Sequence, residues 1–224
     1  MTTPTVLGWW EDGEKFFTAA LDRLDDDALD GPSLLPGWSR RIVVAHVARN
    51  ADALVNLLTW ARTGHETPMY PSPEARDAAI TETAARPAAD LRTDALAAAD
   101  RLAAAVRQLG PDAWSREVRT AQGRTVPASE VLWMRCREAW VHAVDLDAGL
   151  GFGDMPDAVL AALIDDVHRT WQRRGEAPEV VLTAGARTWG AGTATVSGDL
   201  DDLAAWTTGR TPARAGMPAL PAWL

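Results

Sequence analysis

Glycine and proline residues divide the first three quarters of the chain into long segments in which apolar residues recur at helical spacing. In the first segment this spacing is carried by residues such as Trp10 and Phe17. The pattern predicts helices over residues 5–24, 39–62, 74–109 with a break near Pro87, 127–148 and 156–173. Ser39 is suited to cap the second of these helices, and Pro127 is suited to open the fourth.

The pattern changes in the last quarter of the chain. Residues 179–183 and 193–197 are rich in β-branched side chains and predict two strands, and residues 199–208 predict a short helix. The expected fold class is therefore mainly α, with a four-helix bundle followed by a small α+β domain. We expect the bundle over residues 1–150, and a connecting helix with the α+β domain over residues 151–224.

Composition excludes several classes of function. The formal net charge of −9 repels phosphate backbones, so nucleic-acid binding is not expected. Cys136 is the single cysteine, which rules out an intrachain disulfide and fits a reducing cytoplasm. No apolar run approaches the roughly 18 residues of a membrane-spanning helix, and no signal peptide is recognisable. We expect a cytoplasmic protein without a membrane partner, present as a monomer or a weak homo-oligomer.

Two of the predicted helices carry metal-ligating side chains on their apolar faces. Glu138 and His142 are four residues apart, about 40° around the helix axis, and share a face with Val141. His46 lies on the second helix, on a face with Leu57. A carboxylate among apolar residues is costly unless it is paired or binds a cation. Two histidines and one carboxylate suit a catalytic zinc site or non-haem iron. The alternatives are an ordinary hydrogen-bonded pair four residues apart and a separate core histidine.

The remaining polar candidates are weaker. Asp145 is either a hydrogen-bond acceptor for His142, an alternative ligand, or a surface charge at the helix end. Cys136 lies about 160° around the helix from Glu138, which favours a small buried hydrophobic residue over a nucleophile. His168 lies in a polar run and is expected on a solvated face, and His65 is expected to be exposed in a loop.

Several segments resemble the mycothiol-dependent maleylpyruvate isomerase family. The first is LPGWS at residues 35–39, continued by VAHVARNADAL at residues 44–54. The second is RCREAWVHAVDL at residues 135–146. The weaker third comprises SGDL at residues 197–200 and WTTGR at residues 206–210. The likeness extends over nearly the whole chain.

This resemblance implies a DinB-like helical bundle that binds a divalent metal, usually Zn²⁺, and uses mycothiol as its thiol. The family's metal ligands fall on His46, Glu138 and His142. The family's C-terminal arginine falls on Arg210, which would bind substrate and take part in catalysis. Arg76 lies in a family-like stretch and would also bind substrate. Without the resemblance, Arg210 is a charge at a helix end and Arg76 a helix-surface residue.

The function that follows is the cis–trans isomerisation of maleylpyruvate to fumarylpyruvate by reversible addition of a metal-activated thiolate. The expected partners are therefore a small diacid and a low-molecular-weight thiol. One alternative is a mycothiol S-transferase that acts on an electrophile, in detoxification or in natural-product biosynthesis. Another alternative is a non-enzymatic metal- or thiol-binding protein. A zinc hydrolase is the weakest of these hypotheses. Substrate choice is expected to depend on the loops at residues 64–76 and 114–126.

Overall fold

A computed structural model describes residues 3–212 and 217–223 of the chain. The chain divides into two compact units, residues 1–149 and 150–224, which are described one at a time. The predicted fold class, mainly helical with a small C-terminal strand region, is confirmed. In the described ranges no helix is both long enough and apolar enough for a membrane span.

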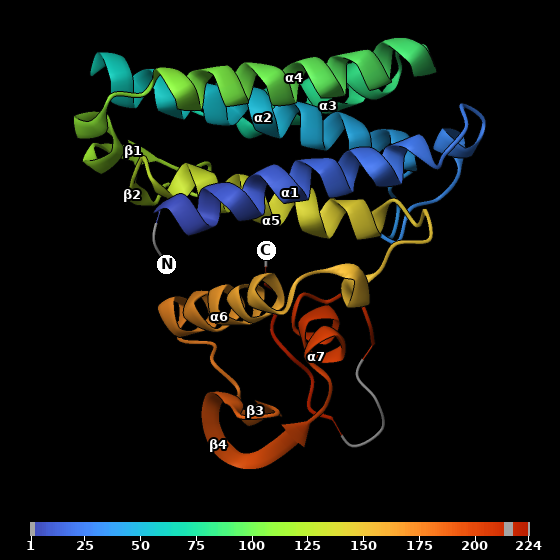
Figure 1. The fold of residues 1–224 in the computed structure, drawn as a ribbon, viewed down its shortest axis with the longest axis vertical. Helices are drawn as coiled ribbons and strands as arrows, with labels where there is room; N and C mark the ends of the chain where they lie inside the picture. Colours follow the sequence, from blue (N-terminus) through green and yellow to red (C-terminus); the bar gives the residue numbers. More distant parts are fainter. Residues whose placement is uncertain (1–2, 213–216, 224) are drawn as a thin grey trace. The chain divides into compact units, whose positions relative to one another are not determined.

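The first unit is built from long helices and one short hairpin. Its elements are α1 (Thr3–Asp22), α2 (Arg40–Thr63), α3 (Pro73–Ala84), α4 (Ala88–Gln108), β1 (Glu117–Arg119), β2 (Thr125–Pro127) and α5 (Glu130–Asp145). Helix α1 packs along α5, and α2 packs against α3, α4 and α5 (Figure 1). Most of the side chains buried between these helices are apolar, among them Leu54, Leu57 and Val131, which are fully buried. Their removal from water is the main favourable contribution to the stability of this unit.

Local signals place α2, the helix that carries His46. The hydroxyl of Ser39 accepts a hydrogen bond from the backbone N–H of Ile42 at 3.4 Å, as expected of an N-cap. The helix ends at Gly64, whose φ of 77° lies in the left-handed region that favours glycine. The break near Pro87 is also confirmed, because α3 ends at Ala84 and α4 begins directly after Pro87.

The start of α5 differs from the prediction. Pro127 does not open the helix; it is the last residue of β2, where it pairs with Glu117 of β1. The two-stranded hairpin consists of edge strands, in which a proline is tolerated. The helix begins three residues later, at Glu130, and ends at Asp145 rather than near residue 148.

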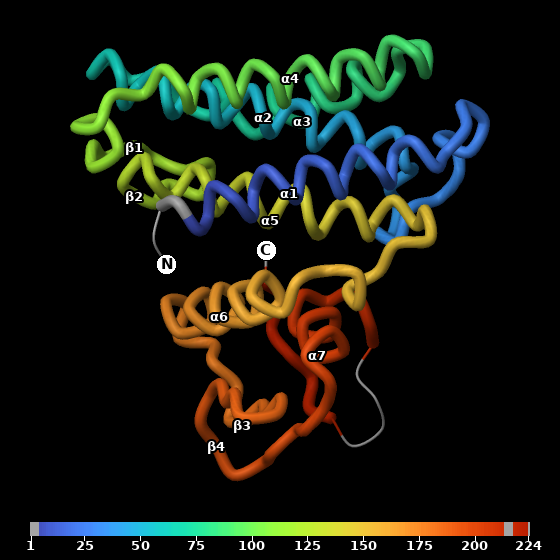
Figure 2. Tube along the Cα trace, in the orientation of Figure 1, coloured from blue at the N-terminus to red at the C-terminus, as the bar shows by residue number. Residues whose placement is uncertain are grey.

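The second unit combines α6 (Asp157–Arg174), the antiparallel strands β3 (Glu179–Ala184) and β4 (Arg187–Ser197), and α7 (Leu200–Thr207). Figure 2 shows the chain passing from α6 through this hairpin to α7. Strand β4 is irregular and contains Gly190 with a φ of 77°, where a Cβ atom would lie 2.3 Å from the oxygen of Val180. Only glycine permits this close approach of the two strands.

The prediction that His168 lies on a solvated face is wrong. Its side chain is 6% exposed, and its ring centroid lies 5.1 Å from that of Trp171. Although the neighbouring residues in the sequence are polar, His168 shares a helix face with Ile164 and Trp171, both of which are buried. Helical periodicity therefore decided the burial of His168, and the local composition did not.

Candidate functional site

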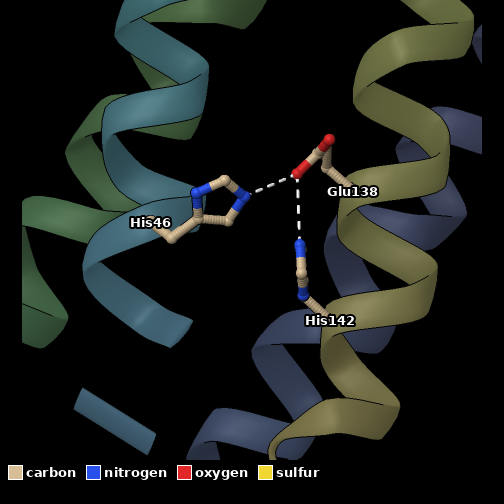
Figure 3. A group of neighbouring side chains, drawn as sticks. All are labelled: His46, Glu138 and His142. Atoms are coloured by element: carbon tan, nitrogen blue, oxygen red, sulfur yellow. Dashed lines mark hydrogen bonds and ion pairs between the residues drawn. The ribbon is translucent and has the colours of Figure 1, made fainter. Parts of the chain in front are cut away.

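Helices α2 and α5 bring His46, Glu138 and His142 to one point (Figure 3). Oε2 of Glu138 lies 2.8 Å from Nε2 of His46 and 3.2 Å from Nε2 of His142. One potential ligand atom of each residue lies within 4.8 Å of the others. Glu138 and His142 meet because they are four residues apart on one helix, whereas His46 reaches them through the packing of α2 on α5. The alternative that His46 is a separate core histidine is therefore wrong, because His46 contacts Glu138.

The three side chains shift each other's protonation. Burial raises the pKa of Glu138. Hydrogen bonds and charges from His142 and His46 lower it by more than burial raises it, so its pKa lies well below the usual range. Burial lowers the pKa of His46 below its ordinary value, despite the opposing effect of Glu138. Burial also lowers the pKa of His142, but Asp145 and Glu138 outweigh this effect and leave it raised. The cluster is thus centred on an ionised carboxylate, which attracts positive charge.

Asp145 is not a surface charge. Its side chain is 0% exposed, and its Oδ2 lies 2.8 Å from Nδ1 of His142. A carboxylate in this position accepts a hydrogen bond from Nδ1–H and holds the imidazole in one tautomer and orientation. Nε2 of His142, which faces Glu138, is then the atom available to a cation.

The donor chemistry of the cluster fits a cation. When Nδ1 of His142 donates to Asp145, the lone pair of a neutral Nε2 points at the Glu138 oxygen 3.2 Å away. Two acceptors at this distance repel each other unless a proton or a metal ion lies with them. Two imidazole nitrogens and one carboxylate oxygen are a ligand set of catalytic zinc sites, and non-haem iron accepts the same set.

Arg76 lies against the site instead of only on the helix surface. Its Nη2 is 3.2 Å from Nδ1 of His46, and its Nη1 donates to Asp77 at 2.7 Å. Its guanidinium also lies over the ring of Tyr70, 5.8 Å from the ring centroid. Arg76 thus places a positive charge beside one of the three converging side chains.

Tyr70 and Trp38 belong to the surroundings of the site, and the sequence prediction did not select them. Burial raises the pKa of Tyr70 to about 12, with the negative charge of Glu138 acting in the same direction against Arg76. The ring centroid of Trp38 lies 5.4 Å from that of His46. Trp38 lies in the LPGWS segment that carried the family resemblance, and Tyr70 lies in the family-like stretch around Arg76, at residues 69–77. Tyr70 is also the chain's only tyrosine, a signal that could have found it.

The other candidates are placed elsewhere. Cys136 is fully buried on α5, and burial raises the pKa of its thiol to about 12, so it stays protonated at neutral pH. His65 is exposed, as predicted. Arg210 follows α7 in the second unit, where its Nη1 donates to the backbone oxygen of Thr208 at 2.7 Å. Its catalytic role stays a prediction.

A family model described as the mycothiol maleylpyruvate isomerase N-terminal domain matches residues 10–147. The chain belongs to this family. Two solved structures of family members are similar to it: a mycothiol-dependent maleylpyruvate isomerase, and a histidine-to-alanine mutant of a protein of the same name. Both are 39% identical and cover 100% of this chain and 98% of their own, with TM-scores of 0.93 and 0.92. A search of curated proteins finds no match.

The family membership confirms the resemblance identified from the sequence. The matched range contains His46, Glu138 and His142, and also Arg76, so the whole cluster on α2, α3 and α5 lies within the family domain. Arg210 lies outside that range, but within the full-length likeness to the solved family structures.

Proposed function

We propose that the protein is a mycothiol-dependent maleylpyruvate isomerase whose divalent metal, most simply Zn²⁺, is held by His46, Glu138 and His142. The observation that carries this proposal is the convergence of these side chains on one carboxylate oxygen. The full-length likeness to an isomerase of this name supports the choice of reaction. A thiol cofactor must stay reduced, which supports the cytoplasm as the compartment of the proposed activity.

A divalent cation and the thiol of mycothiol would supply the chemistry. A divalent cation at the three side chains would lower the pKa of a thiol that binds to it, so that thiolate is available at neutral pH. The thiolate would supply a nucleophile for reversible addition to the conjugated cis double bond, which gives that bond temporary single-bond character, and elimination would return the thiolate unchanged. The protein's own side chains would therefore have to position the reactants and stabilise the negative charge that develops on the substrate oxygen.

Arg76 is suited to bind a carboxylate of the diacid. In the structure its guanidinium donates to Nδ1 of His46, so a neutral His46 carries its ring proton on Nε2. If Nε2 becomes a ligand atom, the proton moves to Nδ1 and Arg76 loses this acceptor. The guanidinium is then available to a substrate carboxylate, for which its forked geometry is well suited.

Tyr70 is suited to donate a hydrogen bond beside Arg76. Because its pKa is raised to about 12, the phenol stays protonated at neutral pH. A protonated phenol stabilises a developing oxyanion, as other oxyanion-hole donors do.

Asp145 is expected to act through His142. The Asp145→Asn variant replaces the carboxylate with a neutral amide, a weaker acceptor for the imidazole N–H, so we expect metal affinity to fall by about 10- to 100-fold. Competition with a chromophoric chelator measures this affinity. Asp147→Asn is the matched control, because Asp147 is exposed two residues further along the chain and should keep the affinity of the wild type. Equal affinities of the two variants would contradict the role of Asp145.

Arg210 is expected to contribute to turnover but not to metal binding. We expect Arg210→Ala to reduce kcat/KM by roughly 100-fold, the usual effect of losing one group that stabilises an oxyanion. Metal content, measured by mass spectrometry, should stay stoichiometric. Arg187→Ala, at an exposed arginine of the same unit, is the control. An unchanged rate in the Arg210 variant would remove this residue from the mechanism.

Cys136 is not expected to act as the nucleophile. The Cys136→Ala variant should retain the rate of the wild type within about twofold, because a buried thiol with a pKa of about 12 supplies almost no thiolate. Alanine is preferable to serine, whose hydroxyl would need a buried hydrogen-bond partner. Complete loss of activity in a folded variant would show that the external thiol had been wrongly assigned.

A comparison of thiols tests the proposed function directly. The zinc-loaded protein is incubated with maleylpyruvate, with and without mycothiol, and fumarylpyruvate formation is followed. We expect isomerisation only when both metal and mycothiol are present. Conjugation of mycothiol to a test electrophile without isomerisation would favour the S-transferase instead. Metal binding without either reaction would favour a non-enzymatic metal-binding protein.

A further inference from the structure

The side chain of Arg135 on α5 is buried between three helices of the first unit, although it carries a positive charge. Its Nε and Nη2 donate to the two carboxylate oxygens of Glu14 on α1, at 2.6 and 3.1 Å. Its Nη1 donates to the backbone oxygen of Val47 on α2 at 2.7 Å, and to Oδ1 of Asn50 on the same helix at 3.3 Å. These hydrogen bonds, which we call the Arg135 clamp, join α5 to both α1 and α2.

The clamp lies beside the three converging side chains on both α2 and α5. On α5, Arg135 precedes Glu138 by three residues and His142 by seven, so a helix of 3.6 residues per turn places all three on one face. On α2, Asn50 follows His46 by four residues and lies one turn further along the same face. The contact of the clamp with α2 and the contact of Glu138 with His46 are thus neighbours along the same pair of helices.

Coordination of a cation by these side chains requires a fixed placement of α2 against α5. Glu138 and His142 keep their spacing through the geometry of one helix, whereas His46 comes from the other (Figure 3). Metal–ligand bonds of about 2.0–2.2 Å tolerate errors of only about 0.5 Å in the position of a ligand. Apolar burial between helices is non-directional. Hydrogen bonds from a planar guanidinium have defined lengths and directions, so they restrict how the two helices are placed.

Stability alone is a poor explanation of the clamp. A buried ion pair often contributes no more to stability than apolar residues of the same volume, since both charges lose their hydration. Buried polar groups can instead select one arrangement of helices among several, as a single buried asparagine does in coiled coils. The carboxylate of Glu14 also accepts a hydrogen bond from Nε1 of Trp10 at 2.6 Å. The partner of Arg135 on α1 is thus itself fixed in place.

We propose that the Arg135 clamp sets the position of α2 relative to α5, and so holds the three metal-ligating side chains within coordinating distance of one another. The inference rests on the proposed function, because it concerns the metal assigned there. Arg135, Glu14 and Asn50 are positioning residues: they act on the ligands through the helices that carry them and do not bind the cation.

A double variant separates positioning from stability and from charge. Arg135→Met with Glu14→Leu removes the clamp, leaves the net charge of the chain unchanged and leaves neither charge without its partner. The full-length variant should keep most of the resistance of the wild type to urea. Its zinc affinity, measured by competition with a chromophoric chelator, should fall by about tenfold, as when other groups that orient metal ligands are lost. The absorption bands of its Co²⁺ complex should also shift, because they depend on coordination geometry.

Two further variants serve as controls. Arg101→Met with Asp52→Leu removes an ion pair between α4 and α2, and should leave the zinc affinity and the Co²⁺ spectrum of the wild type unchanged. Arg135→Lys retains the positive charge, but its compact ammonium lacks the planar fork that reaches Glu14 and Val47 together. We expect Arg135→Lys to lower the zinc affinity as the double variant does.

Wild-type zinc affinity with an unchanged Co²⁺ spectrum in the Arg135 and Glu14 double variant would overturn the inference. An equal loss of affinity in the Arg101 and Asp52 variant would do the same, because removal of any ion pair of α2 would then suffice. Wild-type affinity in Arg135→Lys would also overturn it, and this variant decides the matter if the double variant does not fold. Failure of the proposed function appears separately, as the absence of mycothiol-dependent isomerisation by the zinc-loaded wild type, whatever the measured affinities.

Discussion

Glu138→Ala protein is expected to contain no stoichiometric metal and to lose isomerase activity by roughly a thousandfold or more. The carboxylate contacts both histidines, at 2.8 Å and 3.2 Å, and it is the only anion among the three proposed ligands. Without it, two imidazoles alone would have to hold the cation. Metal content by mass spectrometry and the rate with mycothiol measure the two losses.

The histidines and a matched glutamate complete this test. His46→Ala and His142→Ala are expected to lose the metal as well, because each removes one of three ligands. Glu130→Ala is the control, since Glu130 lies on the same helix but outside the cluster. Full metal retention in all three ligand variants would reject the site.

Arg135→Ala is expected to lower the free energy of unfolding by about 3–5 kcal/mol, because it breaks a buried ion pair and leaves the acceptors of Arg135 without their donor. The Arg135 side chain is 1% exposed. Its Nε and Nη2 donate to the carboxylate of Glu14 on α1 at 2.6 and 3.1 Å, and its Nη1 donates to the backbone oxygen of Val47 on α2 at 2.7 Å. One side chain therefore links the three helices α1, α2 and α5.

Urea unfolding measures this effect, and two variants interpret it. Arg101→Ala is the control, because its ion pair with Asp52 is more exposed and should contribute less than about 1 kcal/mol. A double variant with Arg135→Met and Glu14→Leu should regain much of the lost stability, since no unpaired charge remains. A loss below about 1 kcal/mol for Arg135→Ala would show that Glu14 finds water or another partner.

Helix positions were well predicted where apolar spacing and end signals agree. The N-cap at Ser39 and the stop at Gly64 are local features, and α2 has almost the predicted range. The start of α5 was misplaced because Pro127 suits both a helix start and an edge strand. Local sequence does not separate these two uses of a proline; pairing with Glu117, ten residues away, does.

The order of residues along the chain is enough to predict the components of the candidate site. Helical periodicity places Glu138 and His142 on one face, and the motifs around residues 35–54 and 135–146 identify the family, because both depend only on the order of residues along the chain. How these components meet depends on the packing of the fold. The contact of His46 with Glu138 and the approach of Arg76 to His46 join segments 92 and 30 residues apart. Such contacts arise from the packing of helices and loops, and the spacing of residues along a chain does not specify that packing.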